Sequence, residues 1–457
     1  MSLLRHPALH LLLALLMAAA VLVKPVLFKK TELPQGDAPR YIITGLNLAD
    51  HGVISDEHRP DPTPTLVAGG PLIALEIAAI ALLDQESGKT FRCAVSPRPP
   101  EQPPCPLNLT GMKIAHWLEL SVFAAGGWIL GWLVFRSLPM AWLGFGLIVI
   151  CRELWTDSGQ ALTEPLAYTI LGFFLPAWLN AWQRPADASS TPLWWGLSGL
   201  SLGLLILIKP SAMAILPLGI LLLALSVILG KRPLRGAAWA AALFGLGCLV
   251  VLSPWLLRNL IVLGVPALSH PSYLATTLSH RIAYNAMSLQ EWLVGWIYYL
   301  PDFGDNLAAR LFAPAMYERL DWGDSSYYVY GRDQLYPAAL KAAPEHTAAY
   351  LVRDYVLPDA FKHAAVTLLL AWRGFFVGRL WGLVALVLLA PGLRLVTPEQ
   401  RRWLLLILLP GLLLLFAQAA LSVSITRYNN ALVAPLAMIA AAAIGGLCIR
   451  AYAAIRR

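Results

Sequence analysis

Charged residues are scarce in this sequence, and their scarcity indicates whether the protein is soluble or embedded in a membrane. Asp, Glu, Lys and Arg make up 13% of the 457 residues, whereas 58% are hydrophobic, and the mean hydropathy is +0.64. So much apolar surface exceeds what one soluble core can bury. The composition therefore excludes an ordinary soluble protein and predicts an integral membrane protein.

Cysteine is also rare, and the five cysteines show no C-x-x-C spacing of the kind that many zinc sites use. Cys151, Cys248 and Cys448 lie in or beside apolar runs, where a buried thiol is the ordinary state. Cys93 and Cys105 lie instead in the proline-rich stretch FRCAVSPRPPEQPPC. In an oxidising compartment these two could close a loop through a disulfide, and the sequence leaves open whether they do.

The chain also lacks common signatures of nucleotide and zinc-protease chemistry. It has no G-x-x-x-x-G-K-[ST] phosphate loop and no H-E-x-x-H motif, and no internal repeat is evident. Transporters built from two related halves usually carry such a repeat. Any pocket must therefore be built from the ends of spans and the loops between them.

Ten apolar runs are long enough to cross about 30 Å of hydrocarbon, which takes about 20 helical residues. They cover residues 8–28, 116–135, 138–154, 164–183, 192–208, 211–230, 236–257, 374–392, 403–422 and 429–449. The first resembles a signal peptide but lacks a small-x-small cleavage site and leads into lysines. We expect an all-α polytopic membrane protein of about ten transmembrane helices.

Basic residues set the expected orientation. Lysines and arginines of the short loops fall on one face in this threading, and such loops are retained in the cytoplasm. The cluster Lys231, Arg232 and Arg235 is the clearest example. We therefore expect both termini to be cytoplasmic, and the formal net charge of +8 to reflect topology rather than nucleic-acid binding.

Two long segments, 29–115 and 258–362, then lie on the extracytoplasmic face of a single domain covering residues 1–457. Residues 37–50 carry apolar residues at helical spacing and predict a helix on the membrane surface. Residues 66–83 predict a second interfacial or re-entrant helix, because counting them as a span would move the basic loops outside. The apolar stretch from residue 361 predicts a surface helix followed by the eighth span.

Asp37 follows the first span by a few residues, in the string GDAPRY. A carboxylate held close to the bilayer can act as a general base toward an acceptor hydroxyl or amine while a lipid-borne leaving group stays in the membrane. Composition alone favours a simpler interpretation, a solvated loop aspartate. The pattern of residues around Asp37 favours the catalytic interpretation.

Three cations stand where predicted spans emerge on the extracytoplasmic face, namely Lys209, Arg258 and Arg427. Charges near hydrocarbon are costly and usually paired, and no acid accompanies these three in the sequence. The phosphate of a polyprenyl lipid would supply the partner. Snorkelling to the interface explains any one of them as well, but explains three from separate spans less well.

Glu164 begins the fourth predicted span in ALTEPLAY, and Asp157 comes shortly before it. Both are candidate substrate contacts. Glu164 has an alternative role as a negative charge that complements the N-terminal end of a helix dipole.

An acidic cluster in the first long loop could hold a hard divalent cation through its oxygens. It comprises Asp56, Glu57, His58 and Asp61. Such clusters are more often simply hydrated. We therefore expect no resident metal or other cofactor, with a divalent cation as the open alternative.

Five strings, in this order, resemble the C-type glycosyltransferases (GT-C), and within them the branch of protein O-mannosyltransferases and lipid A aminoarabinose transferases. They are GDAPRYIITGLNLADHGVIS, TEPLAY, LLILIKPSAMAILP, SPWLLRNLIVLGVPALS and RYNNALVAPLAMIAAAA. Together they extend across almost the whole chain. The resemblance implies a GT-C-like fold and an enzyme that uses polyprenyl-phosphate sugars.

The resemblance also implies roles for particular residues. Asp37 maps onto the catalytic aspartate of the first external loop, with Arg40 and Tyr41 beside it. The basic residues of the lipid-phosphate site map onto Lys209, Arg258 and Arg427 with Tyr428. Lys209 departs from the arginine expected there, so the charge is kept while the bidentate fork is lost.

The sequence therefore predicts an inverting glycosyltransferase that moves one sugar from a polyprenyl-phosphate donor to an acceptor on the periplasmic face of a bacterial inner membrane. The acceptor, whether lipid A, another glycan, a lipid or a protein, stays open. Two other functions stay open as well. One is a polytopic lipid or glycan transporter or flippase, and the other is an O-antigen-type ligase that moves a whole glycan from a lipid diphosphate.

Overall fold

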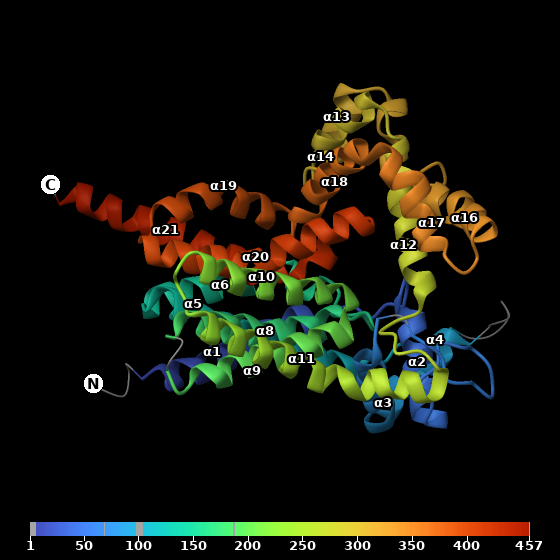
Figure 1. Cartoon of the computed structure of the whole chain (residues 1–457), viewed down its shortest axis with the longest axis horizontal. Helices are drawn as coiled ribbons and strands as arrows, with labels where there is room; N and C mark the ends of the chain where they lie inside the picture. Colours follow the sequence, from blue (N-terminus) through green and yellow to red (C-terminus); the bar gives the residue numbers. More distant parts are fainter. Residues whose placement is uncertain (1–5, 68, 97–103, 186–187, 457) are drawn as a thin grey trace. The chain divides into compact units, whose positions relative to one another are not determined.

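The computed structural model describes residues 6–67, 69–96, 104–185 and 188–456, and over these residues it contains helices and no strand (Figure 1). The predicted all-α fold class is confirmed. The terminal residues 1–5 and 457, which the orientation prediction includes, lie outside the described part.

The chain packs into two compact units. Unit 1 comprises Met1–Ser269, Leu388–Pro410 and Val433–Arg457, and unit 2 comprises His270–Val387 and Gly411–Leu432. Helices α19 (Leu380–Arg394) and α20 (Pro398–Leu421) contribute residues to both.

Unit 1 is a helical bundle with a group of short helices at one end (Figure 1). Its helices are α1 (Pro7–Leu22), α2 (Ala38–His51), α3 (Pro71–Leu83), α4 (Gln85–Val95), α5 (Thr110–Phe135), α6 (Leu138–Val149), α7 (Glu153–Thr156), α8 (Glu164–Gln183), α9 (Thr191–Ile208), α10 (Ile215–Ile228), α11 (Leu234–Leu263) and α21 (Val433–Ile455). Helix α8 packs against both α5 and α9, and α9 packs along α11. The short helices α2, α3 and α4 pack on one another at the end of this bundle.

Helices α2 and α3 form the two loop helices that the sequence predicts. The apolar face of α2, which includes Ala38, Ile42 and Leu46, is buried against α3. Gly45 permits the close approach, because a Cβ there would stand 2.5 Å from the Ile77 side chain. Helix α2 ends at Gly52, whose left-handed backbone suits glycine at the end of a helix.

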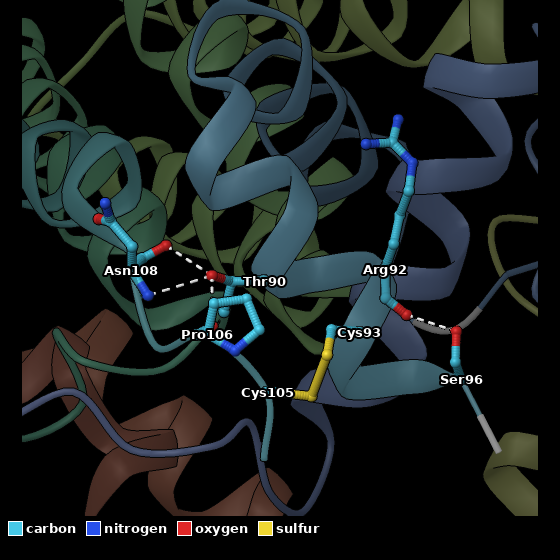
Figure 2. Close-up of a disulfide and its surroundings, with 7 residues drawn as sticks. All are labelled: Thr90, Arg92, Cys93, Ser96, Cys105, Pro106 and Asn108. Carbon is cyan, nitrogen blue, oxygen red and sulfur yellow. Dashed lines mark hydrogen bonds between the residues drawn. A yellow bond between two sulfur atoms is a disulfide. The ribbon is translucent and has the colours of Figure 1, made fainter. Parts of the chain in front are cut away.

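A disulfide between Cys93 and Cys105 closes the loop after α4, with the two Cα atoms 5.7 Å apart (Figure 2). The Thr90 hydroxyl lies within 2.8 Å of the carbonyl oxygens of Pro106 and Asn108, in the segment that leads from this loop to α5. The pairing that the sequence left open is therefore present.

Seven helical segments of the described chain are long and apolar enough to cross a membrane, or eight if the bent pair at 347–394 counts as one. Two of the ten expected spans fall short of this. Helix α6 has only 12 residues, and α8 has 20 residues but is less apolar. Because most of α8 is buried among other helices, it needs less apolar surface than a helix that faces lipid.

Unit 2 contains the second long loop from His270 onward and the bent helix pair as far as Val387. Its helices are α12 (Pro271–Ala283), α13 (Leu289–Tyr298), α14 (Gly304–Leu311), α15 (Tyr327–Tyr330), α16 (Tyr336–Ala342), α17 (Thr347–Leu351) and α18 (Ala360–Phe375). The segment ending in α18 meets α19 at an angle of 108°, as the division of this stretch into a surface helix and a span predicts. Buried Arg281 joins three elements by donating to the carbonyl oxygens of Ala419 and His363.

Candidate active site

The segment that leads from α1 to Asp37 is fixed to the rest of unit 1 by hydrogen bonds at both ends. The Lys113 ammonium donates to the carbonyl oxygen of Lys29 at 2.6 Å and to the Thr31 hydroxyl at 2.7 Å. Further along, the Gln35 backbone N–H donates to the Gln160 side chain at 3.0 Å. The backbone before Asp37 is thus held against the turn between α7 and α8.

Asp37 itself is solvent-exposed and immediately precedes α2. Its carbonyl oxygen accepts from the backbone N–H groups of Arg40 and Tyr41, at 3.2 and 3.4 Å. Pro39 in the first turn suits a helix start, since its missing N–H would have no partner there. The local sequence therefore fixes the carboxylate at the start of a rigid helix, one turn from Arg40.

Arg40 forms an ion pair with Asp56 across the first loop. Its Nε and Nη2 donate to Asp56 Oδ2 at 3.2 and 2.8 Å. The other oxygen of Asp56 accepts from the Thr65 hydroxyl at 2.8 Å. The Arg40 side chain keeps 45% of its surface exposed, so it remains accessible to a ligand.

The acidic cluster of the first loop, for which a divalent cation was the alternative, is engaged in ion pairs. Asp56 pairs with Arg40, while the Glu57 carboxylate accepts from the Thr63 backbone and pairs with Arg59. The hydrogen bonds from Thr63, the backbone one first, lower the pKa of Glu57. The alternative of a divalent cation at Asp56, Glu57, His58 and Asp61 is therefore not favoured, because arginines pair with the first two of these residues.

Arg258 holds both ends of the loop that contains Asp56. Its Nη1 donates to the Thr65 carbonyl oxygen at 3.1 Å, and its Nη2 donates to that of Ile54 at 3.0 Å. The Thr65 backbone N–H also donates to the Ile54 carbonyl oxygen, closing the loop. The guanidinium lies over the Trp255 ring, 5.1 Å from its centroid. Arg258 thus uses two of its guanidinium nitrogens to position the loop.

Lys209 and Glu164, which the sequence singled out separately, form an ion pair. Lys209 Nζ lies 3.1 Å from Glu164 Oε1, and the side chains are 15% and 6% exposed. Lys209 follows the end of α9, and Glu164 stands in the first turn of α8. The expectation that this cation has no accompanying acid is therefore wrong, because packing of α8 on α9 brings the two charges together.

A pair of glycines connects Tyr41 with the end of α9. A Cβ on Gly69 would stand 2.7 Å from the Tyr41 ring, and one on Gly70 would collide with the carbonyl group of Leu207. Both glycines have positive φ, which disfavours other residues. Because Leu207 precedes Lys209 by two residues, the glycine turn that Tyr41 contacts lies next to the end of α9, just before Lys209.

Asp157 lies in the turn between α7 and α8, near the start of the first loop. The Lys29 ammonium donates to the carbonyl oxygens of Thr156 and Trp155. Burial lowers the pKa of Lys29, and the nearby Asp157 carboxylate opposes that shift. Asp157 thus contributes negative charge to the same end of unit 1.

Arg427 and Tyr428 belong to unit 2, in the 3-10 segment Thr426–Leu432. The Arg427 guanidinium lies over the Tyr428 ring at 5.3 Å from its centroid. Their predicted role as substrate contacts stays a prediction.

Sequence reasoning missed a second group of ionisable residues in unit 1. Glu76 of α3 and His116 and Glu119 of α5 each offer a ligand atom, and these atoms lie within 4.8 Å of one another. A signal was present, because Glu76 is a lone acid in an apolar helix and His116 stands three residues before Glu119. This group shows that a divalent cation is possible.

The fold is similar to that of a known membrane glycosyltransferase. No protein-family model and no curated protein matches the sequence. Among solved structures, the archaeal oligosaccharyltransferase AglB from Archaeoglobus fulgidus, in complex with an inhibitory peptide and a dolichol-phosphate, matches with a TM-score of 0.51 at 15% identity. The match covers 97% of this chain and 51% of that one.

Two further structures extend the comparison. The Archaeoglobus fulgidus oligosaccharyltransferase tethered with an acceptor peptide also gives a TM-score of 0.51, at 15% identity over 95% of this chain and 49% of that one. ArnT from Cupriavidus metallidurans bound to undecaprenyl phosphate, also 15% identical, covers 95% and 77% with a TM-score of only 0.41. The two matches with a TM-score of 0.51 show that this chain has the GT-C fold that the resemblance implies. The chain spans about half the length of the oligosaccharyltransferase.

Proposed function

We propose that this chain is an inverting glycosyltransferase that moves a single sugar from a polyprenyl-phosphate donor to an acceptor. The acceptor offers a hydroxyl or amine and belongs to the class of lipid A, glycans, lipids or proteins. Asp37 is the general base. The GT-C fold is compatible with this activity, and the arrangement of residues around α2 supports it.

One observation carries the proposal, namely that separate segments of unit 1 converge around the start of α2. Arg40 reaches the loop that Arg258 holds, and Tyr41 touches the glycine turn beside the Lys209–Glu164 pair. An exposed carboxylate and several cations therefore gather at one end of an apolar bundle. That combination suits a water-soluble acceptor meeting a lipid-linked anionic leaving group.

The proposed reaction is a direct displacement at the anomeric carbon. The acceptor oxygen or nitrogen forms a bond to that carbon while the bond to the phosphate oxygen breaks. Asp37 takes the acceptor proton, and the polyprenyl phosphate leaves with the electron pair of the broken bond. Attack from the face opposite the phosphate inverts the configuration.

The cations divide between substrate contact and support. Arg40 is the proposed phosphate contact because it lies one turn from Asp37 and remains partly exposed. Lys209 has two further N–H donors beyond the one aimed at Glu164, so it can bind phosphate while staying paired. Arg258 acts mainly as a positioning residue for the loop behind Arg40.

The proposal includes a location for the reaction. The chain is a multi-pass membrane protein, and we infer that the α2 end of unit 1 faces the periplasm of a bacterial inner membrane. The disulfide supports this inference because it joins α4 to the same first loop and because disulfides persist in oxidising compartments.

The experiment is a donor panel on the purified protein in lipid vesicles. Polyprenyl-phosphate monosaccharides and a polyprenyl-diphosphate oligosaccharide are supplied with membrane extract as acceptor, and released polyprenyl phosphate and diphosphate are quantified. Release of monophosphate from one monosaccharide donor supports the proposal and identifies the sugar. Release of diphosphate alone would favour the ligase. The ligase is the second candidate because the fold is similar to that of an oligosaccharyltransferase. Absence of release from every donor would favour a transporter.

A further inference from the structure

Glu76, His116 and Glu119 form a buried group between the first loop and the bundle of unit 1. Glu76 lies on α3, while His116 and Glu119 lie three residues apart on α5 and so point to the same side of that helix. The His116 side chain is 1% exposed and that of Glu76 is 12% exposed. The group is therefore largely shielded from water.

Three of the four carboxylate oxygens of this group are buried without a hydrogen-bond donor. Both oxygens of Glu76 and Oε2 of Glu119 are buried and have no hydrogen-bond partner, and Glu76 Oε1 has only the 3.5 Å contact with His116 Nε2. Leaving a buried acceptor unsatisfied is costly, and two carboxylates side by side in a poorly hydrated place add electrostatic repulsion. A bound cation would relieve both costs, as would a proton on the His116 ring or on one carboxyl group.

His116 is oriented as metal-binding histidines are. Its Nδ1 lies 2.9 Å from the Ser158 carbonyl oxygen, an acceptor, so Nδ1 carries the proton and donates it. In the neutral imidazole Nε2 then carries the lone pair, and this atom faces Glu76 Oε1, 3.5 Å away. A backbone carbonyl that fixes the tautomer of a histidine in this way is the usual outer partner of a metal ligand.

The spacing also fits a metal better than a hydrogen bond. A distance of 3.5 Å between Nε2 and Oε1 is long for a hydrogen bond. Two ligands that each stand about 2.0–2.2 Å from a tetrahedral zinc ion are about 3.3–3.6 Å apart. The remaining separations, none above 4.8 Å, can close through the rotatable side chains of the two glutamates.

We propose that Glu76, His116 and Glu119 bind one divalent transition-metal ion, for which Zn²⁺ fits the ligands best. One imidazole nitrogen and two carboxylate oxygens are ligands that zinc accepts, and they leave a fourth position open. The ion links α3 to α5. Through the bond from His116 to Ser158, it also supports the turn that carries Asp157. This site is independent of the proposed transfer reaction, and its test does not use that activity.

The test measures metal content directly. The wild type, His116→Gln and Glu119→Gln are stripped with a chelator, incubated with micromolar ZnCl₂ and freed of excess metal. Zinc per chain is then measured by mass spectrometry. His51→Gln, which removes an exposed histidine at the end of α2, is the matched control. We expect about one zinc per chain in the wild type and in the control, and less than a tenth of that in the two site variants.

Two further measurements keep the outcome decisive. X-ray absorption at the zinc edge of the wild type should show nitrogen and oxygen neighbours at about 2.0–2.2 Å with an imidazole outer shell. Zinc should raise the melting temperature of the stripped wild type but not that of Glu119→Gln. A wild type that retains no zinc, or site variants that retain it fully, would overturn the proposal. A metal-free wild type that Glu119→Gln stabilises would show that protons balance the two carboxylates.

Discussion

Arg40 and Arg258 hold the same loop at different points, although they belong to α2 and α11. Arg40 pairs with the Asp56 carboxylate, and Arg258 donates to the carbonyl oxygens of Ile54 and Thr65 at the ends of that loop. The orientation of Arg40 beside Asp37 therefore depends on a residue far along the chain.

Loss of Arg258 should release this loop. Arg258→Gln removes charge-assisted hydrogen bonds worth about 1.5–3 kcal/mol each, so cleavage after Glu57 by the protease Glu-C should be roughly tenfold faster or more. Arg258→Lys should fail to restore protection, because one ammonium cannot replace the guanidinium fork that reaches two carbonyls. The control is Arg235→Gln, at an exposed position. Equal cleavage rates in all variants would contradict the positioning role.

The ion pair between Lys209 and Glu164 should behave as a buried pair. Lys209→Met or Glu164→Gln alone leaves one uncompensated charge and should cost about 3–5 kcal/mol of unfolding free energy. The double variant should cost less than the sum of the two, by about 0.5–3 kcal/mol. Thermal unfolding of the four proteins in one detergent provides the comparison.

Measurements of transfer activity distinguish a structural role of the Lys209–Glu164 pair from direct contact with the substrate. If Lys209 also contacts the donor phosphate, the double variant should regain stability without regaining transfer. Strictly additive stability losses would mean that the two side chains do not interact in the folded protein.

The disulfide should be present in protein prepared from intact cells. Non-reducing peptide mapping should recover Cys93 linked to Cys105, and Cys93→Ser should lower stability by about 2–4 kcal/mol. Cys448→Ser, which removes an exposed free cysteine, is the control and should change stability little. Free thiols at both positions would contradict the pairing and would also weaken the periplasmic assignment of the first loop.

His280 should make stability pH-dependent. It lies on α12 outside the candidate spans, and burial, assisted by Arg332, lowers its pKa from 6.5 to about 4. Between about pH 6.5 and pH 4, His280 is protonated in the unfolded chain but stays neutral in the folded chain. The free energy of unfolding therefore falls as pH drops through this range, by roughly 1.4 kcal/mol per pH unit.

The measurement for His280 is a series of melting temperatures. The wild type should lose stability between pH 7 and pH 4.5 faster than His280→Gln, which cannot take up the proton. Parallel curves for the two proteins would show that His280 does not carry this dependence.

Local features of the fold were predictable from the sequence. The helical spacing after Asp37 predicted α2, and the apolar run near Ile77 predicted α3. Hydropathy found the long spans because crossing lipid demands an apolar helix of fixed length. Helices α6 and α8 do not meet the length and hydropathy of the long spans, so their place as spans stays a prediction.

Contacts between distant segments were not predictable. Lys209 and Glu164 each carried a signal, but only the packing of α8 on α9 pairs them. Glu76 and His116 lie 40 residues apart, and nothing local indicates that α3 and α5 bring them together. The acidic residues around Asp56 had the composition of a cation site, and the structure pairs Asp56 with Arg40 of α2, 16 residues away.

The central claim is that Asp37 is the base of a transfer reaction. Asp37→Asn keeps the shape of the side chain while removing its ability to accept a proton, so donor binding should persist. Glu86→Gln removes an exposed carboxylate of α4 and is the matched control.

The decisive measurement is the rate of polyprenyl phosphate release from the active donor by the wild type and these two variants in the same vesicles, with donor binding measured in parallel. The account predicts that Asp37→Asn loses about 10²–10⁴-fold in turnover with donor affinity kept, while Glu86→Gln matches the wild type. Equal turnover by the wild type and Asp37→Asn would contradict the assignment and leave Asp157 or Glu164 as the base.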